Sequence, residues 1–166
     1  ILEVRAYNSG IAFKYVFPEA VKGGFDLSID RELTDYTLPE GSMAWITNLA
    51  QDTYTLAPLK DWKFEVERPL VIQLPQGGYA CLAEAEMVDY VRTKFVLNPA
   101  KKNTIIGKMY QSVDLTTPFE TPWRVVMAAD NPCQLLENND LLLNLNPASA
   151  ISDMSWIKPG KQIRDV

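Results

Sequence analysis

The carboxylates best placed to do chemistry lie in one short segment of the chain. Glu84 and Glu86 are two residues apart, directly after an expected strand over Tyr79–Leu82, and Asp89 follows them. Residues i and i+2 of an extended chain point to the same side, so these side chains are expected in one region. Calcium takes ~6–8 oxygen ligands, and a carboxylate-rich segment can supply some of them. The pattern alone favours the alternative, a solvated acidic edge.

Other residues with binding potential have weaker patterns. Lys101-Lys102 predicts a solvent-exposed loop, with contact to a phosphate as the alternative. Arg124 is expected to pair with an Asp or Glu in a partly buried salt bridge. Exposed aromatic rings can stack on sugars, although most tryptophans of a β-sandwich belong to its core. The four tryptophans are Trp45, Trp62, Trp123 and Trp156.

The absence of histidine excludes whole classes of active site. A sequence with no His cannot form a Ser-His-Asp triad, a Cys-His pair or a His-ligated zinc or haem centre. It also has no GxGxxG, P-loop or paired CxxC motif, so nucleotide and structural zinc sites have no motif support. The net charge of −5 argues against a nucleic-acid or anionic membrane surface.

Period-two alternation of apolar residues predicts the elements that position these side chains. This alternation predicts strands at 11–17, 70–74 and 141–145. Further strands are expected at 93–97 and 124–127 from their β-branched and bulky apolar residues, and one short helix at 131–138. Turn residues such as Asn8-Ser9-Gly10 separate them, and eleven prolines exclude long helices. A length of 166 residues with 47% apolar content suits one all-β domain, an antiparallel β-sandwich.

Cysteine usage and the chain ends give little information on location. Cys81 and Cys133 are expected to be buried free thiols, with a single bridge left open. No apolar run reaches the ~20 residues that span a bilayer. The sequence begins as a strand in progress and has no signal-peptide pattern, so we expect a trimmed chain or a fragment. Residues 151–166, which contain the Pro159-Gly160 pair, are interpreted as a linker.

Five motifs in order along the chain resemble family 97 of the glycoside hydrolases. Val4–Tyr15 resembles the family's V-R-A-Y-N-D-G-V-A-F-R-Y, and Ala83-Glu84-Ala85 resembles its T-E-A segment. Thr121–Val126 resembles T-P-W-R-V-I, and Leu141–Asn146 resembles the strand before the interdomain linker. Ser155–Lys161 resembles the S-W-I-K-P-G-K linker itself.

This resemblance implies a fold for the chain and places the catalytic residues in another domain. The expected fold is a partial, galactose-mutarotase-like β-super-sandwich over residues 1–150 that lacks its first strands. Residues 151–166 would lead to an absent catalytic (β/α)8 barrel. Enzymes of the family are calcium-dependent α-glucosidases or α-galactosidases, and their catalytic carboxylates lie in the barrel. No catalytic residue is therefore expected here, and the chain alone should be inactive.

The resemblance also assigns one residue to the site. The family's sandwich glutamate, a calcium ligand, corresponds to Glu84, and no substrate-binding residue is assigned. We expect Glu84 to matter for calcium in the whole enzyme but not for the stability of this domain. Ala83 departs from the family's usual Thr or Ser, and residues 162–165 depart from a Trp-rich run. These departures leave the sugar specificity open.

The resemblance also implies partners for this chain, and two other functions are alternatives to the one it implies. The expected partners are the barrel of the same chain and the oligosaccharide substrate of the whole enzyme, in the periplasm or outside the cell. An apolar patch edged by Trp123, Trp156 and Ile157 is expected where the barrel docks, and with it self-association. The alternative is a stand-alone carbohydrate-binding module that uses Trp45 or Trp62. An aldose-epimerase-like enzyme is disfavoured because that chemistry depends on His.

Overall fold

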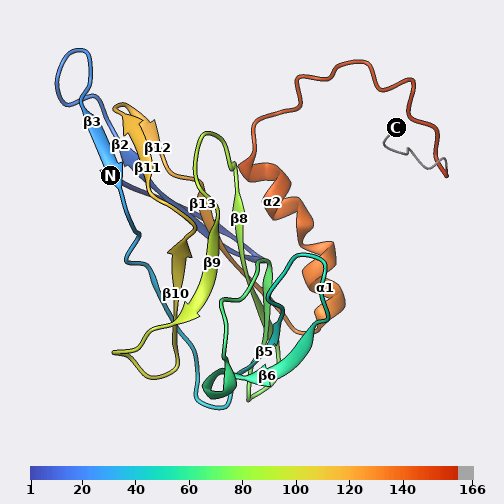
Figure 1. Ribbon diagram of the computed structural model, residues 1–166. Coiled ribbons are helices and arrows are strands. Elements are labelled where there is room, and N and C mark those ends of the chain that lie inside the picture. Colours follow the sequence, from blue (N-terminus) through green and yellow to red (C-terminus); the bar gives the residue numbers. More distant parts are fainter. Residues whose placement is uncertain (161–166) are drawn as a thin grey trace.

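The main sheet of this computed structural model, which describes residues 1–160, is built from antiparallel strands. Its order is β1-β2-β13-β8-β7-β5-β6, with β12 added beside β2 (Figure 1). The strands are β1 Leu2–Tyr7, β2 Gly10–Phe17, β5 Met43–Ile46, β6 Thr55–Pro58, β7 Leu70–Gln73, β8 Tyr79–Ala85, β12 Phe119–Glu120 and β13 Trp123–Ala129.

Two smaller sheets and a short 3-10 turn complete the β structure. One sheet has the order β4-β10-β9, and the other pairs β11 with β3. Every described strand pair is antiparallel, which confirms the predicted all-β class. Their bounds are β3 Asp26–Ile29, β4 Asp35–Thr37, β9 Thr93–Leu97, β10 Thr104–Met109, β11 Val113–Thr116 and η1 Leu59–Asp61.

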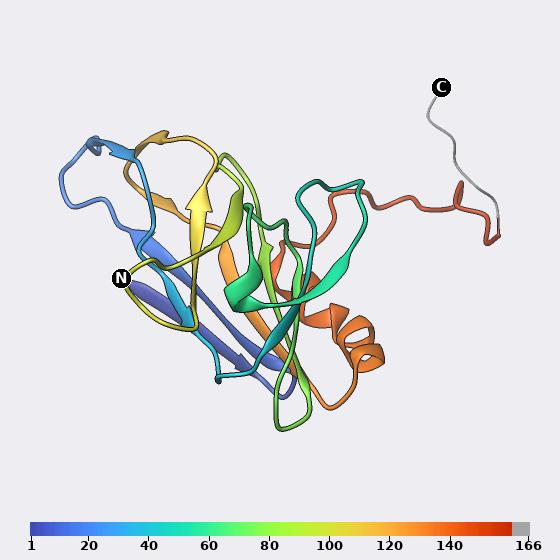
Figure 2. The ribbon, with the colours of Figure 1, turned by 60° about the horizontal axis from the view of Figure 1, so that its bottom comes forward.

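Apolar residues are buried on both faces of the main sheet, in two separate clusters. On one face, Val125 and Cys81 of the sheet pack against Leu135 and Leu141 of the helices. On the other face, sheet residues pack against Phe95 of β9 and strand β10. Figures 1 and 2 show the helices along one side of the main sheet and β9 and β10 on the other. The central strands β8 and β13 are therefore covered on both sides.

The predicted helix is confirmed, and a second helix replaces a predicted strand. Helix α1 spans Pro132–Glu137, and the Asn131 side chain caps it by accepting from two main-chain N–H groups. Helix α2 spans Asn139–Leu145, so the strand expected at 141–145 is wrong. Leu141 and Leu145 are buried while Leu143 is 62% exposed. This is the i, i+4 spacing of a helix face and not the i, i+2 spacing of a strand.

The N-terminal hairpin joins the sheet through a close contact with β13. Strands β1 and β2 are connected at Asn8 and Ser9, as the turn residues predict. Gly10 lies opposite Met127, and a Cβ atom at Gly10 would lie 2.3 Å from the Val126 carbonyl oxygen. Only a glycine allows the main chains to approach this closely here.

Beyond Leu145, the described chain to residue 160 forms neither helix nor strand and runs away from the sheet (Figure 2). The division into 1–150 and a linker at 151–166 stays a prediction, and residues 161–166 lie outside the described part. Within residues 1–160, no helix is long and apolar enough to cross a membrane.

Candidate functional site

Glu84 lies within a strand and not after its end. Strand β8 continues past Leu82 to Ala85, and its register sets Glu84 directly opposite Arg124 of β13. The Glu84 side chain is 2% exposed, so the accessible surface of this residue belongs to its main chain. A solvated acidic edge is therefore wrong for Glu84. The expected salt bridge of Arg124 is confirmed and is more deeply buried than predicted.

The two carboxylate oxygens of Glu84 have different surroundings. Oε1 accepts a hydrogen bond from Thr93 Oγ1 at 2.9 Å and another from Arg124 Nη1. Oε2 contacts the Nε atom of Arg68 but accepts no hydrogen bond from any described residue. One oxygen is thus held by two hydrogen-bond donors, and the other forms an ion pair with Arg68.

Arg124 is fixed from its far side by Glu32. Its Nε donates to Glu32 Oε2 at 2.9 Å and its Nη2 donates to Glu32 Oε1. Tyr90 donates its hydroxyl hydrogen to the same Glu32 at 3.0 Å, and burial followed by the Glu32 charge raises the pKa of Tyr90. Burial by itself lowers the pKa of Arg124. The hydrogen bond to Glu32 and the charges of Glu32 and Glu84 outweigh this effect, so the pKa of Arg124 is raised. Arg124 therefore stays a cation between two carboxylates.

A second buried carboxylate, Glu67, lies beside this pair. Its oxygens are 3.2 Å from Arg92 Nη1 and 3.1 Å from Lys94 Nζ, and 4.0 Å from Arg68 Nη1. The side chain is 5% exposed. Sequence reasoning missed Glu67, Arg68 and Glu32. A signal existed for the first two, because they stand between Val66 and Leu70, which are both fully buried.

Glu86 and Asp89 do not join Glu84, contrary to the expectation. Glu86 has a φ of +54°, which interrupts the strand alternation that would have kept it on the side of Glu84. Its carboxylate accepts from Trp123 Nε1 at 3.0 Å and lies 3.4 Å from Lys14 Nζ. Asp89 also has a positive φ, +49°, and is exposed in the β8–β9 loop.

The remaining candidates also have defined places. Lys101 pairs with Asp35, and Lys102 pairs with Glu40 at 2.7 Å on the surface, as expected for a wet loop. Trp123 is 0% exposed, so it cannot edge an apolar patch as predicted. Trp62 is half-buried, whereas Trp45 is 42% and Trp156 is 56% exposed.

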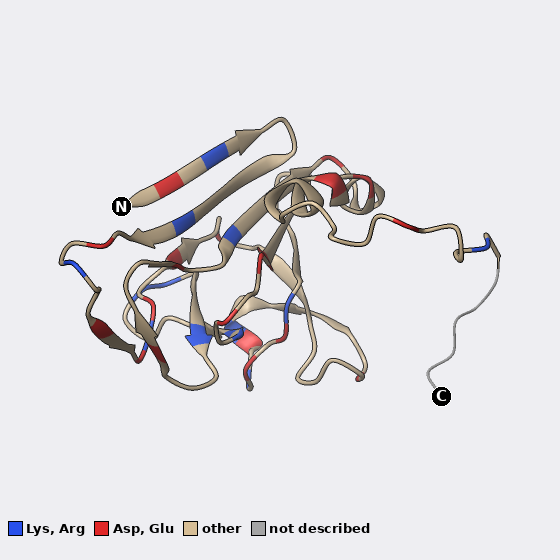
Figure 3. Ribbon diagram, turned by 90° about the horizontal axis from the view of Figure 1, so that it is seen from above, with Lys and Arg blue, Asp and Glu red and all other residues tan. Residues whose placement is uncertain are grey.

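The charge network opens into a hollow of about 380 Å³ whose lining includes Glu67, Arg68, Glu84 and Arg92. Figure 3 shows that basic and acidic positions are interleaved through the domain and do not separate onto two faces. Within residues 1–160, no three or more Cys, Asp or Glu side chains come together as a metal site. This hollow can thus offer single carboxylate ligands but not a complete coordination shell.

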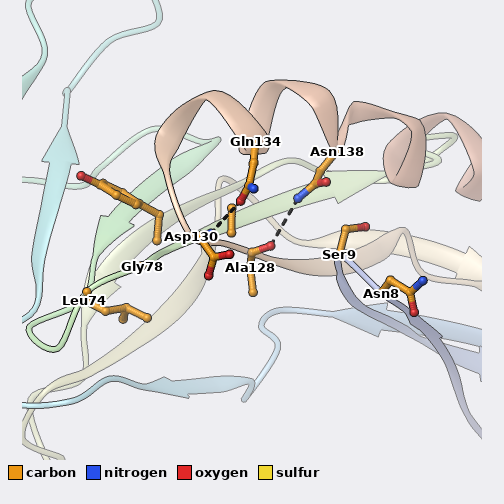
Figure 4. A pocket seen from close by; sticks show the side chains of 11 residues that line it. Asn8, Ser9, Leu74, Gly78, Ala128, Asp130, Gln134 and Asn138 are labelled. Carbon is orange, nitrogen blue, oxygen red and sulfur yellow. Dashed lines mark hydrogen bonds between the residues drawn. The ribbon is translucent and has the colours of Figure 1, made fainter.

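A second hollow, of about 570 Å³, lies at the opposite end of β8 and β13, below the start of α1 (Figure 4). Its amides mostly bind the main chain: Gln134 Oε1 accepts from Asp130 N at 2.8 Å, and Asn138 Nδ2 donates to Ala128 O at 3.3 Å. Among the described residues that line it, Asp130 and Tyr79 alone have titratable side chains. It has no cation or carboxylate pair with which to activate a substrate.

Comparison with known proteins gives a consistent result. Residues 1–147 match the sequence profile of the family described as "Glycosyl-hydrolase 97 N-terminal". The chain is similar to a retaining α-galactosidase of Bacteroides thetaiotaomicron, at 27% identity over 96% of this chain and 29% of that protein. It is also 27% identical to a probable retaining α-galactosidase of Streptomyces bingchenggensis, over 96% of this chain and 25% of that protein.

Solved structures agree with the sequence comparison. A glycoside hydrolase family 97 enzyme from Pseudoalteromonas sp. strain K8, in complex with acarbose, superimposes with a TM-score of 0.83 at 26% identity. The match covers 95% of this chain and 25% of that enzyme. The chain therefore spans between a quarter and a third of the length of the relatives it matches.

Proposed function

The chain belongs to the glycosyl-hydrolase 97 N-terminal family, and from that premise we propose that it is the non-catalytic sandwich domain of a calcium-dependent α-glycosidase. It packs on the catalytic domain of the same polypeptide, walls part of the sugar cleft and donates one metal ligand, Glu84. The observation that carries the proposal is the Glu84 carboxylate, which two donors hold at Oε1 and which belongs to a residue that lines an open hollow.

The charges of the interior support a non-catalytic role. Glycoside hydrolysis uses a pair of carboxyl groups, one of which must give up a proton. Glu32, Glu67 and Glu84 each contact at least one Arg or Lys, as Arg124 does for Glu32 and Lys94 for Glu67. A carboxyl group in such a contact is already engaged by a side chain of its own domain and is not free to meet a glycosidic oxygen. These glutamates suit structure and ligation better than acid catalysis.

Glu84 fits a contribution of one ligand. Calcium requires ~6–8 oxygens at ~2.3–2.6 Å, so the catalytic domain has to supply most of them. The Oε2 atom is a buried acceptor without a hydrogen-bond donor among the described residues, which is the kind of group a cation satisfies. Bound calcium would act as a Lewis acid that polarises the glycosidic oxygen. Arg124 and Thr93 would keep Glu84 in one orientation for it.

Activity and metal measurements on the whole enzyme and on this chain test the proposal. The isolated chain should not cleave nitrophenyl α-glucoside or α-galactoside, whereas the whole enzyme should cleave one of them and lose activity with a calcium chelator. Glu84→Gln in the whole enzyme should weaken calcium binding, and Glu40→Gln, an exposed control, should not. Turnover by the isolated chain that disappears in its Glu84→Gln variant would contradict the non-catalytic role.

Docking and location complete the proposal. Trp156 and Ile157 are 56% and 49% exposed in the segment after α2, and we propose that they meet the catalytic domain. When that domain is absent, the same surface would promote self-association. A periplasmic or secreted location is proposed from the family resemblance. Sedimentation of the isolated chain at high concentration tests the association, and a strict monomer would count against it.

A carbohydrate-binding module remains the second candidate because of one tryptophan. Trp45 lies on β5 with 42% of its surface exposed, and an exposed indole ring can stack on a sugar. Calorimetric titration of the isolated chain with maltose and melibiose tests this function. Binding that Trp45→Ala abolishes would favour the module, and an absence of binding would favour the domain described above.

A further inference from the structure

We infer that Arg68 is an exchangeable counter-ion of Glu84. Its guanidinium pairs with the Oε2 oxygen of Glu84 until a metal ion takes its place. This inference rests on the proposed role of Glu84 as a ligand and names the side chain that regulates access to it. It assigns Arg68 a role opposite to that of Arg124, although both are arginines in contact with the same carboxylate.

The first observation is that the two arginines are held to different degrees. Arg124 is 4% exposed, and its Nε and Nη2 atoms are both engaged by Glu32 while Nη1 holds Glu84 Oε1. It cannot move without breaking a buried pair on both sides. Arg68 is 20% exposed and borders the open hollow. Its guanidinium can therefore leave without opening the core.

The second observation is that Arg68 has a partner besides Glu84. Its Nε forms an ion pair with Oε2 of Glu84. Its Nη1 donates a hydrogen bond to the Thr93 carbonyl oxygen at 3.0 Å. The contact with Oε2 is therefore one of two that hold Arg68, and a divalent cation would offer that oxygen a larger charge.

The third observation is that a displaced Arg68 has another carboxylate within reach. Glu67 Oε2 is 4.0 Å from Arg68 Nη1 and borders the same hollow. A small rotation of the Arg68 side chain toward Glu67 would clear Oε2 and still keep the guanidinium paired. Arg68 and a metal ion thus compete for one oxygen, and the apparent metal affinity falls by the fraction of time that Arg68 occupies it.

Titration of the metal-free whole enzyme with calcium chloride tests the inference directly. Arg68→Met keeps the apolar stem and removes the competitor, so calorimetry should show calcium binding that is about tenfold tighter if Arg68 occupies the site about nine-tenths of the time. Arg92→Met is the matched control. It removes a charge from the same hollow, where Arg92 contacts Glu67 and not Glu84.

A thermal measurement gives a second readout that does not depend on catalysis. Without calcium, Arg68→Met should melt below the wild type because Glu84 Oε2 then has no cation. Calcium should raise its melting temperature by more than it raises that of the wild type. Arg68→Gln, which keeps hydrogen-bonding capacity but no charge, should behave in the same way and serves if Arg68→Met does not fold.

The outcomes separate this inference from the proposed function. If Glu84→Gln weakens calcium binding but Arg68→Met leaves it unchanged or weaker, Arg68 is not a competitor and only the exchange is overturned. If Arg92→Met tightens binding as much as Arg68→Met, the effect belongs to the charge of the hollow as a whole, which also overturns the exchange. If Glu84→Gln has no effect on calcium binding, the ligand role itself fails.

Discussion

The Lys14 ammonium group lies 4.6 Å from the centre of the Trp123 ring, and the indole N–H of that ring donates to Glu86, which Lys14 also contacts. Arg5 lies over the same ring at 4.5 Å. Trp123 is therefore fully buried beneath two cations and is not available to an external partner. A tryptophan expected at a docking edge instead fixes the start of β13 to the β1–β2 hairpin.

The titration of Lys14 should appear in the stability of the chain at high pH. Burial lowers the pKa of Lys14, but the hydrogen bond to Glu120 and the Glu86, Glu120 and Glu3 charges outweigh it and raise the pKa above 10.5. Its stabilising contribution should be complete below about pH 10.5 and should disappear as the pH rises through the folded-state value. Lys14→Arg keeps its charge throughout this range and is the control.

Thermal melts of both proteins between pH 8 and pH 12 measure this effect. The difference in melting temperature between them should be constant up to about pH 10 and should then change to the disadvantage of the wild type. A constant difference up to pH 12 would mean that Lys14 has the same pKa in the folded and unfolded chains.

Glu84 should be important for the stability of this domain, contrary to the expectation from sequence. Glu84→Gln leaves the buried Arg124 with one carboxylate in place of two and leaves Arg68 without its contact on Oε2. Removing one partner of a buried ion pair costs ~3 kcal/mol or more. In a chain of this size that lowers the melting temperature by roughly 6–12 °C.

The exposed pair of Glu40 and Lys102 provides the matched control for this substitution. Glu40 and Lys102 are 76% and 73% exposed, so Glu40→Gln should leave the stability almost unchanged. Urea unfolding of the 166-residue chain and of both variants gives the comparison. Equal midpoints for Glu84→Gln and Glu40→Gln would show that the Glu84 network does not stabilise the fold.

Gly10→Ala should destabilise the sheet at the junction of β2 and β13. The new methyl group would lie 2.3 Å from a main-chain oxygen, which cannot rotate away as a side chain could. Forced packing of this kind costs ~2 kcal/mol. Gly77 also has a positive φ, +97° against +155° at Gly10, but no atom lies within 4 Å of a Cβ added there. Gly77→Ala therefore reports a conformational cost without a close contact. If both variants melt together, the close approach is not the cause.

The two cysteines should differ in their reaction with thiol reagents. Both are free, but only Cys81 is buried, so the expectation that both are buried is wrong for Cys133. Burial raises the pKa of the Cys81 thiol to about 12, and the thiolate is the reactive form. At pH 8, a disulfide reagent should label one thiol per native chain and two after unfolding. Cys133→Ser should remove the fast reaction, and two fast thiols in the native chain would contradict the assignment.

Alternation along the chain predicted strands β2 and β7, and it failed where two patterns coincide. Buried residues alternate along both of these strands. Strands β9 and β13 were predicted from their β-branched and bulky apolar residues, and the burial of β13 does not alternate because both of its faces are covered. Leu141, Leu143 and Leu145 satisfy alternation as well, yet two of them also satisfy the i, i+4 spacing of a helix. Packing against the main sheet favours the helix here, and a local sequence pattern does not show which surface a segment will pack against.

The candidate site was predicted only in part for a related reason. The resemblance identified Glu84 by means of the residues next to it in the sequence, Ala83 and Ala85. Its surroundings come from Arg68, Thr93 and Arg124, which belong to separate segments and meet only after the sheet has formed. No local pattern reports such a meeting. The charged Glu67 and Arg68 between two buried residues were the nearest available sign.

Strand β2 is made long before β13, the strand that it pairs with in the main sheet. Gly10 and Met127 are neighbours in the sheet, although more than a hundred residues separate them. At ~5–20 residues per second, a ribosome needs roughly 6–23 s to make that stretch. During this time the nascent chain carries the β1–β2 hairpin, with Leu2, Val4 and Ile11 on its surface, and a lone hairpin is marginally stable. Ala12, which is fully buried in the finished sheet, therefore stays uncovered on this hairpin until β13 has been made.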